Sequence, residues 1–529
     1  MTGSISAIGT GVLVRFHLRR DRLMLVWWVL GGILLYWSQA ASVEGLYPTQ
    51  AEFDRAAASM ENNAAFIAMA GPARALNTVG GQVAWQASAF GAILAGLMSM
   101  FLVGRHTRAE EESGRDELVR SGVVGRHAPL VAAGLVVVIA NVLFGGLVAV
   151  SLIATGLDAA GSVNLGLAAA LAGLVFGTVA LVAAQLTSST RATYGITGAV
   201  IAASYVLRAV GDVGNGTLSW LSPIGWGQAM HAFSGERWWP ALVSVVAVLV
   251  LAVAARLLFE RRDIGSGIWA AQPGPARAGS DLQGPLGLAW RLQRGSMVGW
   301  TIGLFLTGLS YGAIGNDIED LIGDSEFSRD VFAQGGGSLV DSFYAVAALM
   351  IALIAAGFSI SSALRARGEE DAGRSEPVLS TAVTRWRWAR SHLAVTVGGT
   401  VVVIGAGGLG LGLGYALVTG DGSALGRLFA ATIPYVLPVL VLVAVTWLAY
   451  GFTSRAATLG WLALAFCLVV MMFGELLRFP EWVVELSPFS HMALMPAQAF
   501  AAVPVLVLLV IAGGLAWTGV TALRRRDLV

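Results

Sequence analysis

The sequence RAEEESGRDELVRSGVVGR at residues 108–126 returns as RGEEDAGRSEPVLSTAVTR at residues 367–385. At a constant offset of 259 residues, ten of the nineteen positions are identical. Each copy lies between two long apolar stretches, so the surroundings repeat together with the charged motif. This internal repetition predicts that the chain consists of two duplicated halves.

Shorter repeated motifs support the duplication at three other points along the chain. They are LSP at 221–223 and 486–488, RRD at 261–263 and 525–527, and SSTRA at 188–192 beside TSRA at 453–456. Because each pair occupies the same place in its half, the order of the elements is predicted to repeat as well.

The apolar stretches around these motifs are long enough to cross a bilayer. The chain is 56% apolar and 12% charged, whereas soluble domains are typically about 25% charged. A spanning helix needs about 20 mainly apolar residues, because hydrocarbon satisfies none of the backbone polar groups. Twelve segments meet this requirement: 23–41, 84–104, 129–155, 165–186, 194–210, 239–259, 297–315, 341–364, 391–418, 428–450, 457–474 and 500–523.

These segments predict an all-α polytopic membrane protein of about twelve transmembrane helices, arranged as two tandem six-helix halves. The first half is expected at residues 1–259 and the second at residues 297–529. The stretch 260–296 contains the flexible sequence QPGPA, which predicts a cytoplasmic linker. Short outer helices are expected at 53–58 and 63–70.

The distribution of basic residues predicts how the chain is oriented. All 33 basic residues are arginines, and with the N-terminus inside 26 of them fall on cytoplasmic segments. Arginines of short loops stay on the cytoplasmic side, so both termini are expected to be cytoplasmic in the plasma (inner) membrane. No basic patch is interleaved with aromatic residues, and nucleic acid is therefore not an expected partner.

The first copy of the charged motif is predicted to form a short polar helix. Thr107 stands three residues before Glu110, which is the spacing of a capping box. Acidic residues in the first turn suit the helix dipole. Glu111 and Arg115 are spaced as an i,i+4 ion pair, worth a few tenths of a kcal/mol.

The remaining residues of the motif predict that its two copies are unequal. Asp116 and Arg120 form a second i,i+4 pair in the first copy, and Gly122 is expected to stop the helix. Gly368 and Pro377 interrupt the helical pattern of the second copy, which also lacks a threonine cap. We therefore expect two related contacts of unequal strength.

A charged run between two spans often serves only to fix the topology of the chain through its arginines. Glutamates have no use in that role, and strict duplication of the run favours a specific contact instead. Carboxylates and guanidinium groups together suit a protein interface with charge-assisted hydrogen bonds.

The pattern EEExGRxEL at 110–118, after the second of six spans, resembles the permease subunits of type-2 ABC exporters. The fused twelve-span form with YPTQ at 47–50 is similar to actinobacterial permeases described as polyketide-antibiotic or multidrug exporters. The resemblance covers essentially the whole chain. It implies a permease that exports hydrophobic or amphipathic compounds, such as antibiotics or drugs, with two separate ABC ATPase subunits bound per chain.

The resemblance also implies which residues act. The charged helices would be coupling helices that dock on the ATPase through Glu110, Glu111, Glu112, Gly114, Arg115, Glu117, Glu369, Glu370, Asp371, Gly373, Arg374 and Glu376. Short re-entrant outer helices are implied at 211–238 and 475–499, where Ser-Pro at 222–223 and 487–488 suits a helix start. The substrate cavity would lie between the second and fifth spans, although packing is the commoner role for such residues. Its candidate lining residues are Gln86, Met98, Tyr205, Trp461, Met471, Met472 and Phe473.

The energy for transport is expected to come from a separate protein, and not from this chain. A P-loop needs a lysine that reaches the phosphates of the nucleotide, and this sequence contains no lysine. No catalytic constellation or metal-ligand spacing is present in the sequence, and the six histidines are scattered. We therefore expect no enzyme activity, no metal and no cofactor in this chain, with ATP and Mg²⁺ used by the partner ATPase.

Two other functions stay open from the sequence. An ion-coupled twelve-span secondary transporter would normally carry ionisable residues within its spans, and the predicted spans are almost free of charge in their middle portions. Arg208 lies near a span end, where its side chain is expected to reach the interface. A membrane assembly or signalling protein that uses an ATPase is the third possibility.

Overall fold

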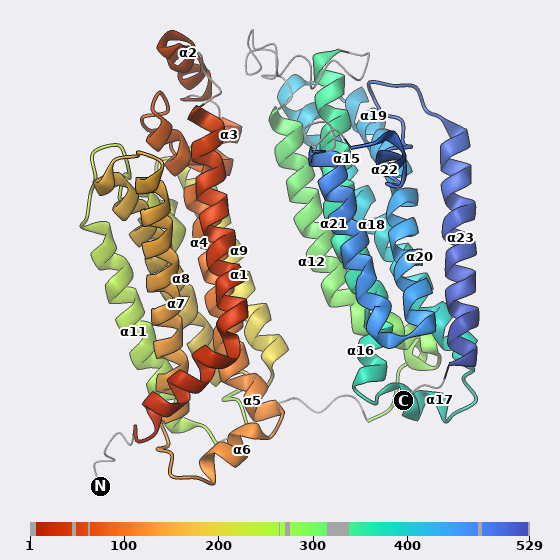
Figure 1. Cartoon of the computed structure of the whole chain (residues 1–529), viewed down its shortest axis with the longest axis horizontal. Helices are drawn as coiled ribbons and strands as arrows, with labels where there is room; N and C mark the ends of the chain where they lie inside the picture. Colours follow the sequence, from red (N-terminus) through yellow and green to blue (C-terminus); the bar gives the residue numbers. More distant parts are fainter. Residues whose placement is uncertain are drawn as a thin grey trace. The chain divides into compact units, whose positions relative to one another are not determined.

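The computed structural model describes residues 7–44, 49–61, 64–263, 265–269, 276–314, 338–473 and 479–526. These residues form helices and connecting turns, with no strand among them. Twelve of the described helices are long and apolar enough to cross a membrane, which confirms the predicted number of spans. The chain divides into two compact units, residues 1–274 and 275–529, each drawn with its own bundle in Figure 1.

The first unit contains six long helices. They are α1 Thr10–Glu44, α4 Val79–His106, α7 Ala128–Ala154, α8 Ala159–Leu186, α9 Thr190–Val213 and α11 Pro240–Arg261. Helices α4 and α8 are mostly buried, whereas α11 exposes most of its surface. Small residues bring α7 and α8 together, because a Cβ at Gly145 would lie 2.3 Å from the carbonyl oxygen of Gly166.

The second unit repeats this set of long helices. They are α12 Pro285–Ile314, α15 Leu339–Ala363, α18 Arg385–Thr419, α20 Val436–Phe452, α21 Leu459–Phe473 and α23 Ala502–Arg525. The fourth span begins earlier than predicted, with α19 Ser423–Thr432 and a 3-10 turn at Ile433–Tyr435. Helices α12 and α18 pack through glycine, since a Cβ at Gly410 would lie 2.1 Å from the carbonyl oxygen of Phe305.

Short helices lie between the long ones at the opposite end from the charged motifs. The expected helices of the outer loop are α2 Gln50–Glu61 and α3 Ala64–Ala70. In the first unit a 3-10 turn, Leu218–Leu221, precedes α10 Pro223–Gln228. The Ser222 hydroxyl accepts hydrogen bonds from the amides of Ile224 and Gly225, which confirms the predicted helix start.

The corresponding Ser-Pro pair of the second unit does not start a helix. The short helix α22 is Glu481–Glu485, before the pair, and the Ser487 amide donates to the carbonyl of Val484. Ser487 therefore follows a helix end, and the residues after it form turns. Residue 474 of the predicted eleventh span and residues 475–478 of the predicted outer segment lie outside the described residues.

The connection between the two units is shorter than the predicted linker at 260–296. Helix α12 begins at Pro285, a residue that suits a helix start because it has no amide hydrogen to leave unpaired. At the other end, the amides of Ile268 and Trp269 donate to carbonyls of Gln185 and Leu186 at the end of α8. Residues 270–275 lie outside the described part, as do Tyr47 and Pro48.

Candidate functional site

Each copy of the charged motif folds as two short helices joined at a glycine. We call residues 108–120 the first charged segment and residues 365–379 the second charged segment. The first consists of α5 Arg108–Glu112 and α6 Arg115–Arg120, and the second of α16 Arg365–Asp371 and α17 Ser375–Leu379.

The break falls at the same repeated glycine in both segments. Gly114 has φ 70° and Gly373 has φ 68°, in the left-handed region that side chains disfavour. The prediction of one continuous helix in the first copy is therefore wrong. The second copy is broken at this glycine too, while Gly368 and Pro377 lie within its helices.

The predicted capping box does not form. The Thr107 hydroxyl donates to the carbonyl of Val103 at 2.6 Å, and it makes no capping bond to α5. Helix α4 runs almost directly into α5, and the amide of Glu111 donates to the carbonyl of Thr107. Helix α5 therefore begins directly after α4 without a side-chain cap.

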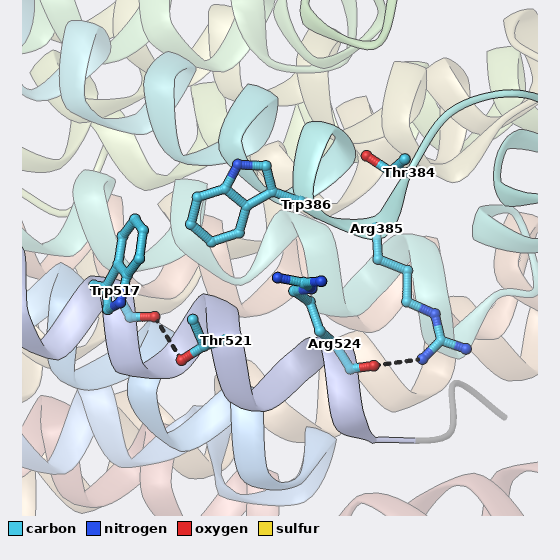
Figure 2. A pocket seen from close by; sticks show the side chains of 6 residues that line it. All are labelled: Thr384, Arg385, Trp386, Trp517, Thr521 and Arg524. Carbon is cyan, nitrogen blue, oxygen red and sulfur yellow. Dashed lines mark hydrogen bonds between the residues drawn. The ribbon is translucent and has the colours of Figure 1, made fainter.

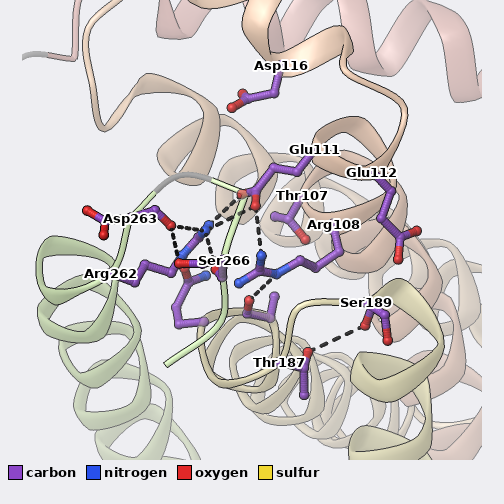
Figure 3. Close-up of polar contacts among 12 residues, drawn as sticks. Thr107, Arg108, Glu111, Glu112, Asp116, Thr187, Ser189, Arg262, Asp263 and Ser266 are labelled. Carbon is purple, nitrogen blue, oxygen red and sulfur yellow. Dashed lines mark hydrogen bonds and ion pairs between the residues drawn. The ribbon is translucent and has the colours of Figure 1, made fainter. Parts of the chain in front are cut away.

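Glu111 is tied to the end of the last span of its own half. Its carboxylate accepts hydrogen bonds from Arg262, at 2.5 and 3.0 Å, and from Arg108 at 2.8 Å (Figure 3). Arg262 also donates to the side-chain oxygen of Gln185, at the end of α8. The predicted pair of Glu111 with Arg115 is wrong, because the buried partners satisfy the Glu111 carboxylate.

Glu370 makes the equivalent contact in the second half. Arg526 donates to both carboxylate oxygens, at 2.7 and 2.6 Å, and the Tyr450 hydroxyl donates at 2.5 Å. Glu111 and Glu370 occupy matching positions of the repeated motif, while Arg262 and Arg526 occupy matching positions of the repeated RRD motif. We call Glu111–Arg262 and Glu370–Arg526 the two Glu–Arg ties.

The preceding glutamates also pair in matching ways. Arg115 lies 3.6 Å from Glu110, and Arg374 lies 2.9 Å from Glu369. The hydrogen bond and the charge of Glu369 raise the pKa of Arg374. Glu110 has an additional partner in Arg20 of α1, at 2.6 Å. Helix α1 is thereby fastened to the first charged segment.

The third acidic position differs between the segments. Glu112 accepts hydrogen bonds from the amide and hydroxyl of Thr190, at 2.9 and 2.7 Å, where α9 begins. Asp371 pairs instead with Arg367 of its own helix at 3.1 Å. The first charged segment therefore reaches the fifth span, and the second does not do so through this residue.

Several residues of the segments face away from their own half. In the first segment the Arg115 side chain is 61% exposed, Leu118 is 76% exposed and Glu117 is also exposed. The predicted pair of Asp116 with Arg120 is confirmed at 2.5 Å. In the second segment the exposed residues are Gly368, Asp371, Ala372, Gly373, Arg374, Glu376 and Pro377. These residues, and not Glu111 or Glu370, are accessible to a partner.

The predicted cavity residues do not gather around one described pocket. Met98 is fully buried in the core of the first unit, which indicates a packing role. Tyr205 is half-buried and donates to the carbonyl of Met69. Trp461 is exposed, and Met471 packs against the core of the second unit.

The other cavity candidates add little to this description. Gln86 is half-buried and contacts Gln82 at 3.5 Å. The side chains of Met472 and Phe473 lie outside the described residues. The substrate cavity therefore stays a prediction.

Two further groups of ionisable side chains are buried among the described residues of the first unit. Asp21 contacts His106 at 2.5 Å, and His106 contacts His17, near the charged segment. Arg208 is fully buried, lies 3.5 Å from Asp212, and donates to carbonyls at the end of α3. The last carbonyls of α3 hold its guanidinium group, so Arg208 has partners within the protein, and its place at the membrane interface stays a prediction. In the described part of the chain, no group of three or more metal-ligating residues is found.

Sequence reasoning missed the arginine partners of the two ties. Arg262 and Arg526 were recognisable only as members of a repeated motif at the end of the sixth and twelfth spans. The charged motif and the RRD motif both occur once in each half. This joint repetition is the sequence signal that points to a contact between them. Gln185 and Tyr450, which support these arginines at the ends of the fourth and tenth spans, carry no such signal.

Comparison with known proteins places this arrangement among membrane permeases. The family profile described as "Multidrug efflux system permease Rv1217c, C-terminal domain" matches residues 282–524. The chain is 40% identical over 523 residues to the multidrug efflux system permease protein Rv1217c of Mycobacterium tuberculosis. The alignment covers 98% of this chain and 95% of that protein.

Proposed function

The chain belongs to the family of Rv1217c-like multidrug efflux system permeases, and from this premise we propose that it is the membrane subunit of an ATP-driven, ABC-type exporter. Its cargo is a hydrophobic or amphipathic compound such as an antibiotic or drug. Both termini lie in the cytoplasm, and the charged segments therefore lie on the side where ATP is available.

The two Glu–Arg ties carry the proposal. A coupling element must be held by the span that it moves, and each charged segment is held by the end of the last span of its own half. Ion pairs that are buried and hydrogen-bonded on both sides are short and directional. The duplication of this contact supports two separate ATPase subunits, one for each segment.

The exposed residues of the segments supply the docking surface. Arg115, Glu117 and Leu118 in the first segment face away from the bundle. When the ATPase subunits close on ATP and Mg²⁺, displacement of α6 or α17 passes through the tie to the last span. Since the arginine of each tie also contacts the end of the fourth span of its half, that span moves as well.

Family membership disfavours the ion-coupled carrier. The buried Asp21, His106 and His17 are the residues that would best serve proton coupling. His106 is the last residue of α4, so the group lies at the end of the span beside the charged segment and not at mid-membrane. We assign it to the attachment of α1 to α4.

Reconstitution of the full chain into liposomes, with the ABC ATPase subunit that co-purifies with it, tests the proposal. We expect drug-stimulated ATP hydrolysis and drug movement that stops when nucleotide is removed. Drug movement driven by a proton gradient alone, without any ATPase, would overturn the proposal.

A further inference from the structure

The second unit contains a pocket that the export function does not use. It has a volume of about 540 Å³ and lies between the start of α18 and the end of α23 (Figure 2). Its lining residues are Thr384, Arg385, Trp386, Trp517, Thr521 and Arg524. The predicted orientation places it at the cytoplasmic face of the membrane.

The floor of the pocket is positively charged. Arg385 donates to the carbonyls of Arg524 and Arg526, at 3.3 and 2.7 Å, through one terminal nitrogen. In the part of the chain that the structure describes, neither Arg385 nor Arg524 pairs with a carboxylate. Two arginines therefore line the pocket with donors available to an anion.

The wall of the pocket is aromatic and open to the surroundings. Trp386 and Trp517 meet edge to face, with ring centroids 5.0 Å apart, and Trp517 is 62% exposed. Tryptophan is enriched at the membrane interface, where one side of the ring meets acyl chains and the other meets head groups. This wall continues the apolar surface of α23 towards the two arginines.

The first unit has a different set of residues at the same place. Matching the repeats aligns Arg524 with Glu260, Trp386 with His127, and Trp517 with a valine. Glu260 lies 3.1 Å from Arg256 and 3.4 Å from His127. The first unit therefore has a carboxylate at this place, paired with Arg256 and His127, and it lacks the tryptophan wall.

We propose that the pocket of the second unit binds the phosphate head group of an anionic membrane phospholipid. The phosphate lies between Arg385 and Arg524, and the acyl chains follow Trp386 and Trp517 into the bilayer. The Thr384 hydroxyl oxygen accepts a hydrogen bond from the amide of residue 387. The hydroxyl hydrogen of Thr384 is then free to donate to the phosphate. Basic pockets between transmembrane helices on the cytoplasmic side bind such head groups. The proposal requires a membrane but does not depend on ATP-driven export.

Native mass spectrometry of the full-length protein tests the proposal. The purified chain is titrated with phosphatidylglycerol, with phosphatidylcholine of the same acyl chains, and with soluble glycerol phosphate. We expect one phosphatidylglycerol to stay bound where phosphatidylcholine and glycerol phosphate do not. Arg385→Gln with Arg524→Gln should weaken this binding by at least about tenfold, since both charges that attract the anionic head group are removed.

The first unit supplies a matched control. Arg126→Gln with Arg261→Gln removes two positive charges, at the positions that align with Arg385 and with Arg525 next to the pocket, and should leave phosphatidylglycerol binding unchanged. Arg524→Glu installs the carboxylate found in the first unit without touching the hydrogen bonds of Arg385, and it should abolish binding in a folded protein. A photoactivatable phosphatidylglycerol should label peptides of α18 and α23.

Three outcomes would overturn the proposal. Equal loss of lipid in the control variant would mean that only bulk charge matters. Equal binding of glycerol phosphate would make the pocket a site for soluble anions. Unchanged lipid binding in Arg524→Glu, with loss of the ATPase subunit, would make the surface a protein interface.

Discussion

The two charged segments have the same motif and the same Glu–Arg tie, but they are fastened to their halves differently. The first is also attached to α1 through Arg20 and to α9 through Thr190. In the second, Glu369 and Asp371 pair with arginines of the segment itself. Both halves therefore share the contact between the charged segment and the last span. Among the described residues, the contacts to the first and fifth spans are found in the first half only.

The two segments also differ in the surface that they offer. Leu118 and Val123 are 76% and 88% exposed in the first half. Proline and alanine occupy the matching positions, 377 and 382, in the second half. An exposed leucine beside charged residues is suited to fill a pocket on a partner. We infer that the first segment binds its ATPase more tightly, and that the second transmits movement with a weaker hold.

The largest expected effect comes from breaking the ties. Glu111→Gln leaves Arg108 and Arg262 buried without their carboxylate, and removing one partner of a buried ion pair typically costs about 3–5 kcal/mol. Glu370→Gln leaves only Arg526 in that position and keeps the Tyr450 hydroxyl within reach. We expect both variants to lose drug-stimulated ATP hydrolysis, and Glu111→Gln to lower the melting temperature more.

A double variant separates the tie from general damage. Adding Arg262→Gln to Glu111→Gln removes one of the two unpaired cations, so part of the lost stability should return without recovery of coupled ATP hydrolysis. A coupling energy of about 1–3 kcal/mol between the two positions is expected from a double-mutant cycle. Additive effects, with full stimulation by drug, would contradict the tie.

The spans were predictable and the ties were not, for a physical reason. A bilayer requires about 20 consecutive apolar residues, so each span can be predicted from one continuous stretch of the sequence. Glu111 has two local candidate partners, Arg115 and Arg108, of which it contacts Arg108, and a distant partner, Arg262. The local rule favours Arg115 by only a few tenths of a kcal/mol, and burial against α8 decides for Arg262.

The same limit explains the errors at turns. Ser-Pro at 222–223 starts a helix, but at 487–488 it follows one, because the two preceding residues already belong to the end of α22 or its cap. Glycine in a helical pattern costs about 1 kcal/mol, which does not show whether the helix bends there. Gly114 and Gly373 both take a left-handed φ in the structure, and the sequence pattern alone does not show this.

An intermediate effect is expected at the docking surface. Leu118→Ala removes an exposed apolar side chain that contacts nothing essential within its own half, so the melting temperature should not change. If Leu118 anchors the ATPase, truncation should weaken binding by roughly thirtyfold, as for an interface hot spot of about 2 kcal/mol. Surface plasmon resonance with the ATPase subunit measures this difference, and Pro377→Ala is the matched control in the second half.

The direction of that result decides between two interpretations of the asymmetry. A larger loss for Leu118→Ala than for Pro377→Ala supports unequal docking. Equal losses would mean that the two ATPase sites are equivalent and that Leu118 is merely exposed.

The smallest effect is expected where the two segments are most alike. Gly114 and Gly373 share a left-handed φ, and no atom lies within 4 Å of a Cβ added at either position. Alanine there meets open space, so the only penalty is backbone strain of about 1 kcal/mol. Gly114→Ala and Gly373→Ala should therefore lower the melting temperature by the same small amount, measured by scanning fluorimetry in detergent.

Because strain at either glycine pushes its segment towards a straight helix, each variant should also reduce drug-stimulated ATP hydrolysis without reducing basal hydrolysis. A large loss of stability in only one of the two variants would show that one segment needs its bend for folding. The same glycine bend would then have different roles in the two halves.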